Sequence, residues 1–177
     1  MDVRAKILDA ALRLTFETGI AALTQPRIAQ AAGVRQSHLT YYFPTRAVLL
    51  EGVAQYMMEG MMQGMQAVAR THGGKGADAL ARAIGETVAD PRRARVMLAL
   101  IVASDEEPGI KVWLRDFIAN LRARIAQVLE EAGLDPSRAA LFHTMMVGTA
   151  ILNVARDDEG SRREARHTAR AALELLA

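Results

Sequence analysis

Proline and glycine interrupt this chain at intervals that suit helices. Three acid–proline pairs place proline where the first turn of a helix tolerates it, because its missing N–H would have no partner there; they are Asp90-Pro91, Glu107-Pro108 and Asp135-Pro136. Between the breaks, apolar residues recur at the helical period, as Ile7, Ala11 and Leu14 do near the start. No segment shows the alternation of a strand. The sequence therefore predicts an all-α fold of about nine helices.

The same residues predict where each helix begins and ends. Thr24 and Thr45 are expected to cap helices, and Gly19 and Gly33 to end them. The three glycines within His72–Gly76 predict a turn. The expected helices span about residues 2–18, 24–32, 36–43, 45–70, 77–89, 90–104, 107–133, 135–156 and 161–177.

Composition limits the possible functions. The 177 residues include no cysteine, which excludes thiolate catalysis, Cys-ligated zinc and iron–sulfur clusters. Hydrophobic residues make up 51% and charged residues 24%, as in globular proteins. The sequence contains no uncharged apolar run of about 18 residues, which is the length needed to span a membrane. The first nineteen residues mix acids and bases, unlike a signal peptide, so we expect a cytoplasmic protein.

Charge is distributed unevenly along the chain. The first fifty residues carry six basic side chains and three acids, although the net charge of the whole chain is only +2. Between Ile20 and Leu50 there is no acid at all. Because a carboxylate would repel a phosphate backbone, this segment is suited to binding nucleic acid.

Thr24–Phe43 has the pattern of two short helices joined by a turn at Gly33–Arg35. On the second helix, Leu39, Tyr42 and Phe43 share one arc, and Ser37 and Tyr41 occupy the centre of the opposite arc. That outward arc offers hydroxyl, amide and imidazole groups, which can reach base edges and phosphates. The alternative is an ordinary helical corner.

These residues resemble the TetR family of transcriptional regulators. The matching residues are Ile7–Leu12, Gly19, Thr24, Ile28-Ala29, Ala32–Val34, Leu39, Tyr41–Phe43, Thr45 and Leu49-Leu50. Four positions depart from the usual family pattern: Thr15 replaces a phenylalanine, Arg35 a small polar cap, Thr40 a tyrosine and Arg46 a lysine. These departures affect the operator sequence that we would expect, because three of the four lie in the motif or directly after it.

The resemblance implies a three-helix helix-turn-helix DNA-binding domain in residues 1–46, with its motif at about 24–43, and an effector-binding and dimerisation domain in residues 47–177. It implies a homodimeric, sequence-specific repressor that binds a palindromic operator on double-stranded DNA and is released by a small apolar or aromatic effector. No catalytic residue, cofactor or metal is expected. The alternative is an all-helical small-molecule-binding or enzymatic protein with a degenerate head.

The resemblance and the helical geometry together predict ten DNA-binding residues. We expect base edges to be contacted by Gln36, Ser37, His38 and Thr40. We expect the DNA backbone or an outer base to be contacted by Gln25 and Arg27. Phosphates are expected at Arg35, Tyr41, Tyr42 and Arg46, where Tyr42 could equally be a core residue with an exposed hydroxyl.

Soft apolar side chains on later helices predict the effector site. The candidates are Met58, Met61, Met62, Met65, Met97, Trp113, Phe117 and Met145. Methionine is flexible enough to line an adaptable cavity, but a methionine-rich core stripe is the alternative. His72, His143 and His167 lack metal-ligand spacing, and His143 is expected to be a hydrogen-bonded core or interface residue.

Small residues near the C-terminus predict the dimer contact. They are Gly148, Thr149, Ala150, Ala165, Ala169 and Ala172. Such residues let helices approach closely, and the family pairs its last two helices across a two-fold axis. The alternative is that these residues pack inside one subunit.

Overall fold

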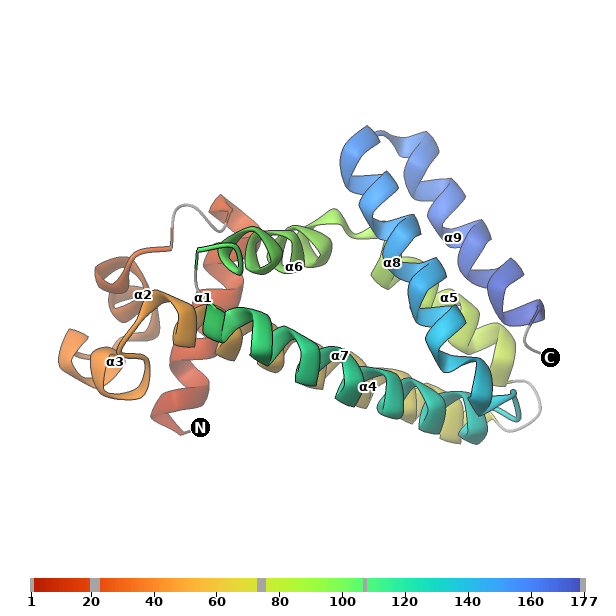
Figure 1. Cartoon of the computed structure of the whole chain (residues 1–177), viewed down its shortest axis with the longest axis horizontal. Coiled ribbons are helices and arrows are strands. Elements are labelled where there is room, and N and C mark those ends of the chain that lie inside the picture. Colours follow the sequence, from red (N-terminus) through yellow and green to blue (C-terminus); the bar gives the residue numbers. More distant parts are fainter. Residues whose placement is uncertain (1, 20–22, 73–75, 107, 176–177) are drawn as a thin grey trace. The chain divides into compact units, whose positions relative to one another are not determined.

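The computed structural model describes residues 2–19, 23–72, 76–106 and 108–175 (Figure 1). Within these ranges the chain forms nine α-helices, a single turn of 3-10 helix and no strand, which confirms the all-α prediction. The helices are α1 (Val3–Thr18), α2 (Gln25–Ala32), α3 (Gln36–Tyr42), α4 (Arg46–His72), α5 (Gly76–Ala89), α6 (Pro91–Ala103), α7 (Pro108–Glu131), α8 (Ala139–Arg156) and α9 (Glu159–Glu174), and the 3-10 turn is η3 (Pro136–Arg138).

Most of the predicted helix ends are confirmed. Gly19 and Gly33 follow α1 and α2 with φ values of 80° and 65°, a region that glycine enters without a steric penalty. The Thr45 hydroxyl accepts from the amide of Val48 at 3.2 Å. The expected cap at Thr24 is only half right, because Thr24 occupies the N-cap position without a side-chain hydrogen bond. Residues 73–75 of the expected turn lie outside the described residues.

The last two helices begin at other residues than the sequence predicted. The Asp135 carboxylate accepts from the amide of Ser137 at 2.9 Å and holds a 3-10 turn, so α8 starts only at Ala139. Helix α9 starts two residues early because Asp158 and Ser161 form a capping box. The pKa of the Asp158 carboxyl lies below its usual value, chiefly because that carboxyl accepts the Ser161 amide.

The chain divides into two compact units. The first contains the residues up to Glu59 together with Arg95–Arg115. Its core is one apolar cluster to which α1, α2, α3, the first part of α4, α6 and the start of α7 contribute. The side chains at the centre of that cluster are Ile7, Leu8, Ile28, Leu39, Phe43, Val53, Val96 and Leu100, each no more than 1% exposed. The helix-turn-helix segment Thr24–Phe43 therefore packs on a core that it shares with α1, α4, α6 and α7.

One close contact within this core involves Gly52 of α4. A Cβ atom at Gly52 would lie 2.8 Å from Cε1 of Phe43 and 3.1 Å from Cδ2 of Leu8, closer than side-chain carbons normally approach. Phe43 directly follows α3 and is 1% exposed. The absent side chain at Gly52 therefore lets α3 and α1 pack closely on α4.

The second unit comprises Gly60–Ala94 and Asp116–Ala177. Helix α9 packs against α5 and α8 within it (Figure 1). The three alanines of α9 that were expected at the dimer contact, Ala165, Ala169 and Ala172, are fully buried inside this subunit. The alternative interpretation is therefore confirmed for α9, and the dimer prediction was wrong for these alanines. A Cβ at Gly85 of α5 would lie 3.2 Å from Cα of Arg166, so small residues serve the contact of α5 with α9.

A buried amide joins three helices of the second unit. Asn153 of α8 is 1% exposed, and its Nδ2 donates to the carbonyl oxygens of Val88 and Ala89 at 3.3 and 2.9 Å. Its Oδ1 accepts from the Ser161 hydroxyl at 2.9 Å. The side chain thus satisfies terminal carbonyls of α5 and links them to the first turn of α9.

The expected division between residues 46 and 47 falls in the first turn of α4, whose residues up to Glu59 belong to the first unit. None of the helices in the described ranges combines the length and the hydropathy needed to cross a membrane.

Two glycines on α4 give a matched pair of stability predictions. We expect Gly52→Ala to lower the free energy of unfolding by about 1–3 kcal/mol, because the added methyl meets the buried Phe43 ring. We expect Gly60→Ala to raise it by about 1 kcal/mol, because a Cβ there meets no described atom within 4 Å and alanine favours the helix. Urea unfolding of both variants measures the difference. Stabilisation by both substitutions would contradict the close contact at Gly52.

Candidate nucleic-acid interface

The turn between α2 and α3 is set by the backbone of Gly33. Its φ of 65° is left-handed, and its amide donates to the carbonyl of Gln30 at 3.1 Å. The amide of Val34 donates to the carbonyl of Ala29 at 3.0 Å. No described atom outside the neighbouring residues lies within 4 Å of a Cβ at Gly33, so glycine is favoured there by backbone conformation and not by lack of space.

Leu39 of α3 and the C-cap residue Phe43 are buried, and most other side chains of α3 are exposed. Leu39 and Phe43 are 0% and 1% exposed, and Tyr42 is half-buried, as the arc predicted. The large side chain of Tyr41 points outward and is 81% exposed. Of the ten predicted DNA-binding residues, eight are exposed: Arg27, Arg35, Gln36, Ser37, His38, Thr40, Tyr41 and Arg46; Gln25 and Tyr42 are half-buried.

Local contacts limit what some of these side chains can offer. The Thr40 hydroxyl donates to the carbonyl of Gln36 at 3.1 Å, so its lone pairs and methyl group face outward rather than its proton. Tyr41 and Tyr42 meet edge to face, with ring centroids 5.2 Å apart. Thr40 is therefore suited to accept a hydrogen bond or to contact a thymine methyl group.

Arg46 has a structural contact that sequence reasoning missed. Its Nη1 donates to the carbonyl of Leu23 at 3.1 Å, which ties the first turn of α4 to the segment before α2. The spacing after Phe43 indicated a cation here but not this carbonyl, because Leu23 precedes Arg46 by 23 residues. Substitutions at Arg46 will therefore change both charge and the packing of the head.

Arg35 occupies the N-cap position of α3, where its guanidinium, which has donors only, cannot accept the cap hydrogen bond. Its role as a phosphate contact stays a prediction. Arg4 is a second cation near α3, and the sequence did not single it out. Its guanidinium carbon lies 5.7 Å from the centroid of the Phe43 ring. Only the packing of α1 against α3 reveals this placement.

Two family models match the two parts of the chain. A family model described as bacterial regulatory proteins of the tetR family matches residues 7–53. A second, described as the tetracyclin repressor-like C-terminal domain, matches residues 73–176. The protein belongs to the TetR family. It is a DNA-binding transcriptional regulator of that family. No curated protein matches the chain.

Solved structures share the fold of this TetR-family chain over its full length. A TetR-family regulator from Mesorhizobium loti has a TM-score of 0.75 at 18% identity, covering 98% of this chain and 94% of its own. A transcriptional regulator from Rhodococcus sp. RHA1 has a TM-score of 0.79 at 18% identity, covering 99% and 97%. The multidrug binding protein EbrR, complexed with proflavin, has a TM-score of 0.63 at 22% identity, covering 97% and 99%. These identities establish likeness of fold alone.

The predicted effector residues of this TetR-family chain fall into both compact units. Met58, Met97 and Trp113 belong to the first unit, where they are half-buried against its core. The other five belong to the second unit: Met61, Met62, Met65, Phe117 and Met145. Of these, Met62, Met65 and Phe117 are buried, and Met61 and Met145 are half-buried. The assignment of these residues to an effector site stays a prediction.

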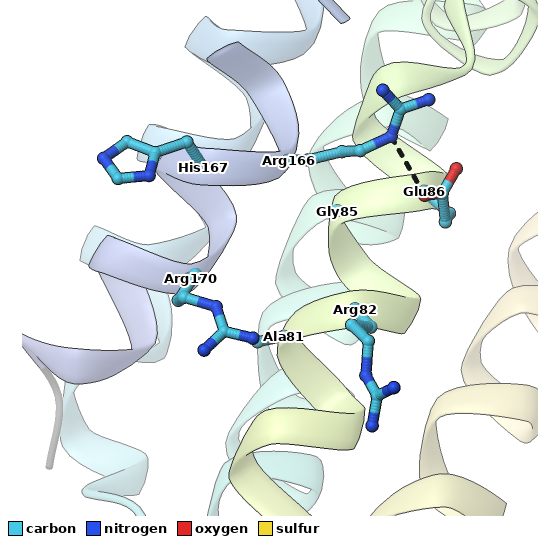
Figure 2. A pocket seen from close by; sticks show the side chains of 7 residues that line it. All are labelled: Ala81, Arg82, Gly85, Glu86, Arg166, His167 and Arg170. Atoms are coloured by element: carbon cyan, nitrogen blue, oxygen red, sulfur yellow. Dashed lines mark hydrogen bonds and ion pairs between the residues drawn. The ribbon is translucent and has the colours of Figure 1, made fainter. Parts of the chain in front are cut away.

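A groove of about 250 Å³ lies between α5 and α9, where the sequence suggested no site (Figure 2). Its lining residues are Ala81, Arg82, Gly85, Glu86, Arg166, His167 and Arg170. Figure 2 shows Arg166 and Glu86 pointing toward one another, with Nε and Oε1 2.9 Å apart. Arg170 pairs in turn with Asp78 at 3.1 Å. Two of the arginines that line this groove, Arg166 and Arg170, are thus held in ion pairs.

His143 is a half-buried residue of α8, and Arg122 of α7 donates to its Nδ1 at 3.4 Å. Burial, and next the positive charge of Arg122, hold the pKa of His143 below its ordinary value. His143 is therefore a half-buried, hydrogen-bonded histidine, as predicted. Among the described residues, no group of three histidine or acidic side chains is placed to hold a metal ion.

Proposed function

We propose that this TetR-family protein is a cytoplasmic homodimeric repressor that binds a palindromic operator and is released by a small apolar or aromatic molecule. In this proposal residues 1–46 contact DNA, and residues 47–177 bind the effector and dimerise. The alternative of an enzyme has less support, because both parts of the chain match families of transcriptional regulators.

The outward face of α3 is the observation that carries this proposal. Gln36, Ser37, His38, Thr40 and Tyr41 are all exposed, and their polar groups can donate to or accept from base edges. No carboxylate occurs between Ile20 and Leu50 to repel the phosphates. A helix anchored by buried residues and presenting only neutral polar groups and cations is suited to the major groove.

Helix α8 supports the homodimer. One face of it, sixteen residues long and about 24 Å in length, is exposed and carries no charge. The residues of this α8 face are Ala140, Leu141, Thr144, Val147, Gly148, Ile151, Leu152 and Ala155. Leu141 and Leu152 are 54% and 61% exposed. A continuous apolar surface of this kind is typical of a protein contact, and two-fold symmetry makes a second copy of α8 its natural partner.

Soft side chains support an apolar effector. The methionines of α4 lie on one side of the helix, and the buried ones are Met57, Met62 and Met65. EbrR, which has the same fold, binds proflavin, a planar aromatic molecule. Differential affinity for two shapes of the dimer would release DNA, and a hundredfold release requires about 2.7 kcal/mol of coupling.

Selection of bound genomic fragments tests operator binding. We expect an enriched inverted repeat with half-sites about 34 Å apart or a small multiple of that distance. Gln36→Ala should weaken the base preference at one position of each half-site, with a loss of about 1–3 kcal/mol of discrimination between bases there. Arg35→Gln, at the adjacent residue, should lower the affinity for all DNA sequences alike. Recovery of fragments with no shared repeat would contradict the proposal.

Mass measurement in solution tests the dimer. We expect Leu152→Glu to give monomers at micromolar concentration and to weaken operator binding, because it places two carboxylates in an apolar contact. Val112→Glu is the control, since Val112 is similarly exposed at 56% but lies on α7 in the first unit. If both variants remain dimeric, the dimer contact does not lie on this face of α8.

A substitution on α4 tests the effector site. We expect Met61→Trp to leave operator binding by the free protein within about twofold, and to abolish release by compounds from a panel of planar aromatic molecules that includes proflavin. The larger ring would fill the space that the effector occupies. Operator affinity in the presence of each compound, together with the melting temperature, is the measurement. Joint loss of DNA binding and stability would show that the methionines form a core instead.

A further inference from the structure

The first turn of α1 brings a cation to the C-terminal end of the recognition helix. Arg4 is exposed, and its guanidinium carbon lies 5.7 Å from the centroid of the Phe43 ring. Phe43 is the C-cap residue of α3 and is almost fully buried. The face of an aromatic ring attracts a cation, and the partial negative charge at the C-terminal end of a helix adds to that attraction. Arg4 is therefore held beside the end of α3.

The charge of Arg4 is not neutralised within the part of the chain that the structure describes, where no carboxylate lies within 4.0 Å of its guanidinium. Arg13, farther along the same helix, differs in this respect. Its Nε lies 3.7 Å from Oδ2 of Asp9, one turn away. Of these two arginines on α1, Arg4 thus keeps its charge available for an outside anion.

Each end of α3 has a cation beside it. Arg35 occupies the N-cap position of α3, and Arg4 lies at the opposite end, beside Phe43. The helix has seven residues and is therefore about 10 Å long. The major groove is about 12 Å wide between its two phosphate backbones. A helix of this length inserted in the groove brings each end close to a backbone.

The geometry points to Arg4 as a further DNA-binding residue that contacts a phosphate on the strand facing the C-terminal end of α3. This inference rests on the proposed binding of duplex DNA through α3. Arg35 and Arg4 then hold the two backbones on either side of the groove and fix the depth and tilt of α3 between them. The contact carries no base information itself, but it positions Gln36–Thr40 for readout.

The salt dependence of DNA binding tests this role separately from stability. With a random-sequence duplex as the probe, log K falls with log salt by about 0.9 for each phosphate contact. We expect Arg4→Gln to reduce this slope by about 0.9 per subunit, so that its loss of affinity between 50 and 200 mM salt is three- to fourfold smaller for each subunit bound. Arg4→Lys should keep the slope, because it keeps the charge.

Arg13→Gln is the matched control, since it removes the same charge from another exposed position on α1 and should leave the slope unchanged. A lower melting temperature for Arg4→Gln with an unchanged slope would overturn the inference, because Arg4 would then only pack on Phe43. An equal reduction of the slope by Arg13→Gln would also overturn the inference. The random duplex also separates this inference from the repressor proposal: absence of an inverted repeat contradicts the proposal, while a reduced slope for Arg4→Gln still supports the phosphate contact.

Discussion

The Phe43 ring and the Leu8 side chain lie so close to the backbone of Gly52 that a Cβ atom there would come within 2.8 Å of the ring and 3.1 Å of the leucine. Helix α3 depends on this contact because seven residues are too few to form a stable helix alone. Leu39 and Phe43 fasten it to α1 and α4, and the opposite arc is thereby exposed. The polar face for which DNA readout is proposed is thus exposed because Leu39 and Phe43 are buried on the opposite side.

Two cations from outside the motif also hold the segment that follows α3. Arg46 ties the first turn of α4 to the carbonyl of Leu23, ahead of α2. Arg4 of α1 lies over the ring of Phe43. These cations therefore act as structural ties within the protein, and a guanidinium has several donors, so the same side chains can also take the phosphate contacts proposed for them.

In the second unit, alanine and asparagine together determine how α5, α8 and α9 pack. The alanines of α9 allow its backbone to approach α5, and Asn153 satisfies carbonyls that the end of α5 would otherwise leave without a partner. The charged residues of α9 form ion pairs at its rim, as Arg166 does with Glu86. This packing leaves the uncharged face of α8 exposed, and that face is the surface for which a second copy is proposed.

The sequence by itself determined the all-α fold, the helix-turn-helix and nearly all helix ends, because apolar period, glycine and proline act locally. It also identified Leu39 and Phe43 as the buried arc of α3 and His143 as a hydrogen-bonded histidine. Only the tertiary structure decided which surface each small residue meets. Ala165, Ala169 and Ala172 have the spacing of a helix contact, but spacing cannot distinguish α5 of the same subunit from α8 or α9 of another. The roles of Arg4, Arg46 and Asn153 were likewise hidden, because each depends on a residue far away in sequence that folding brings within a few ångströms.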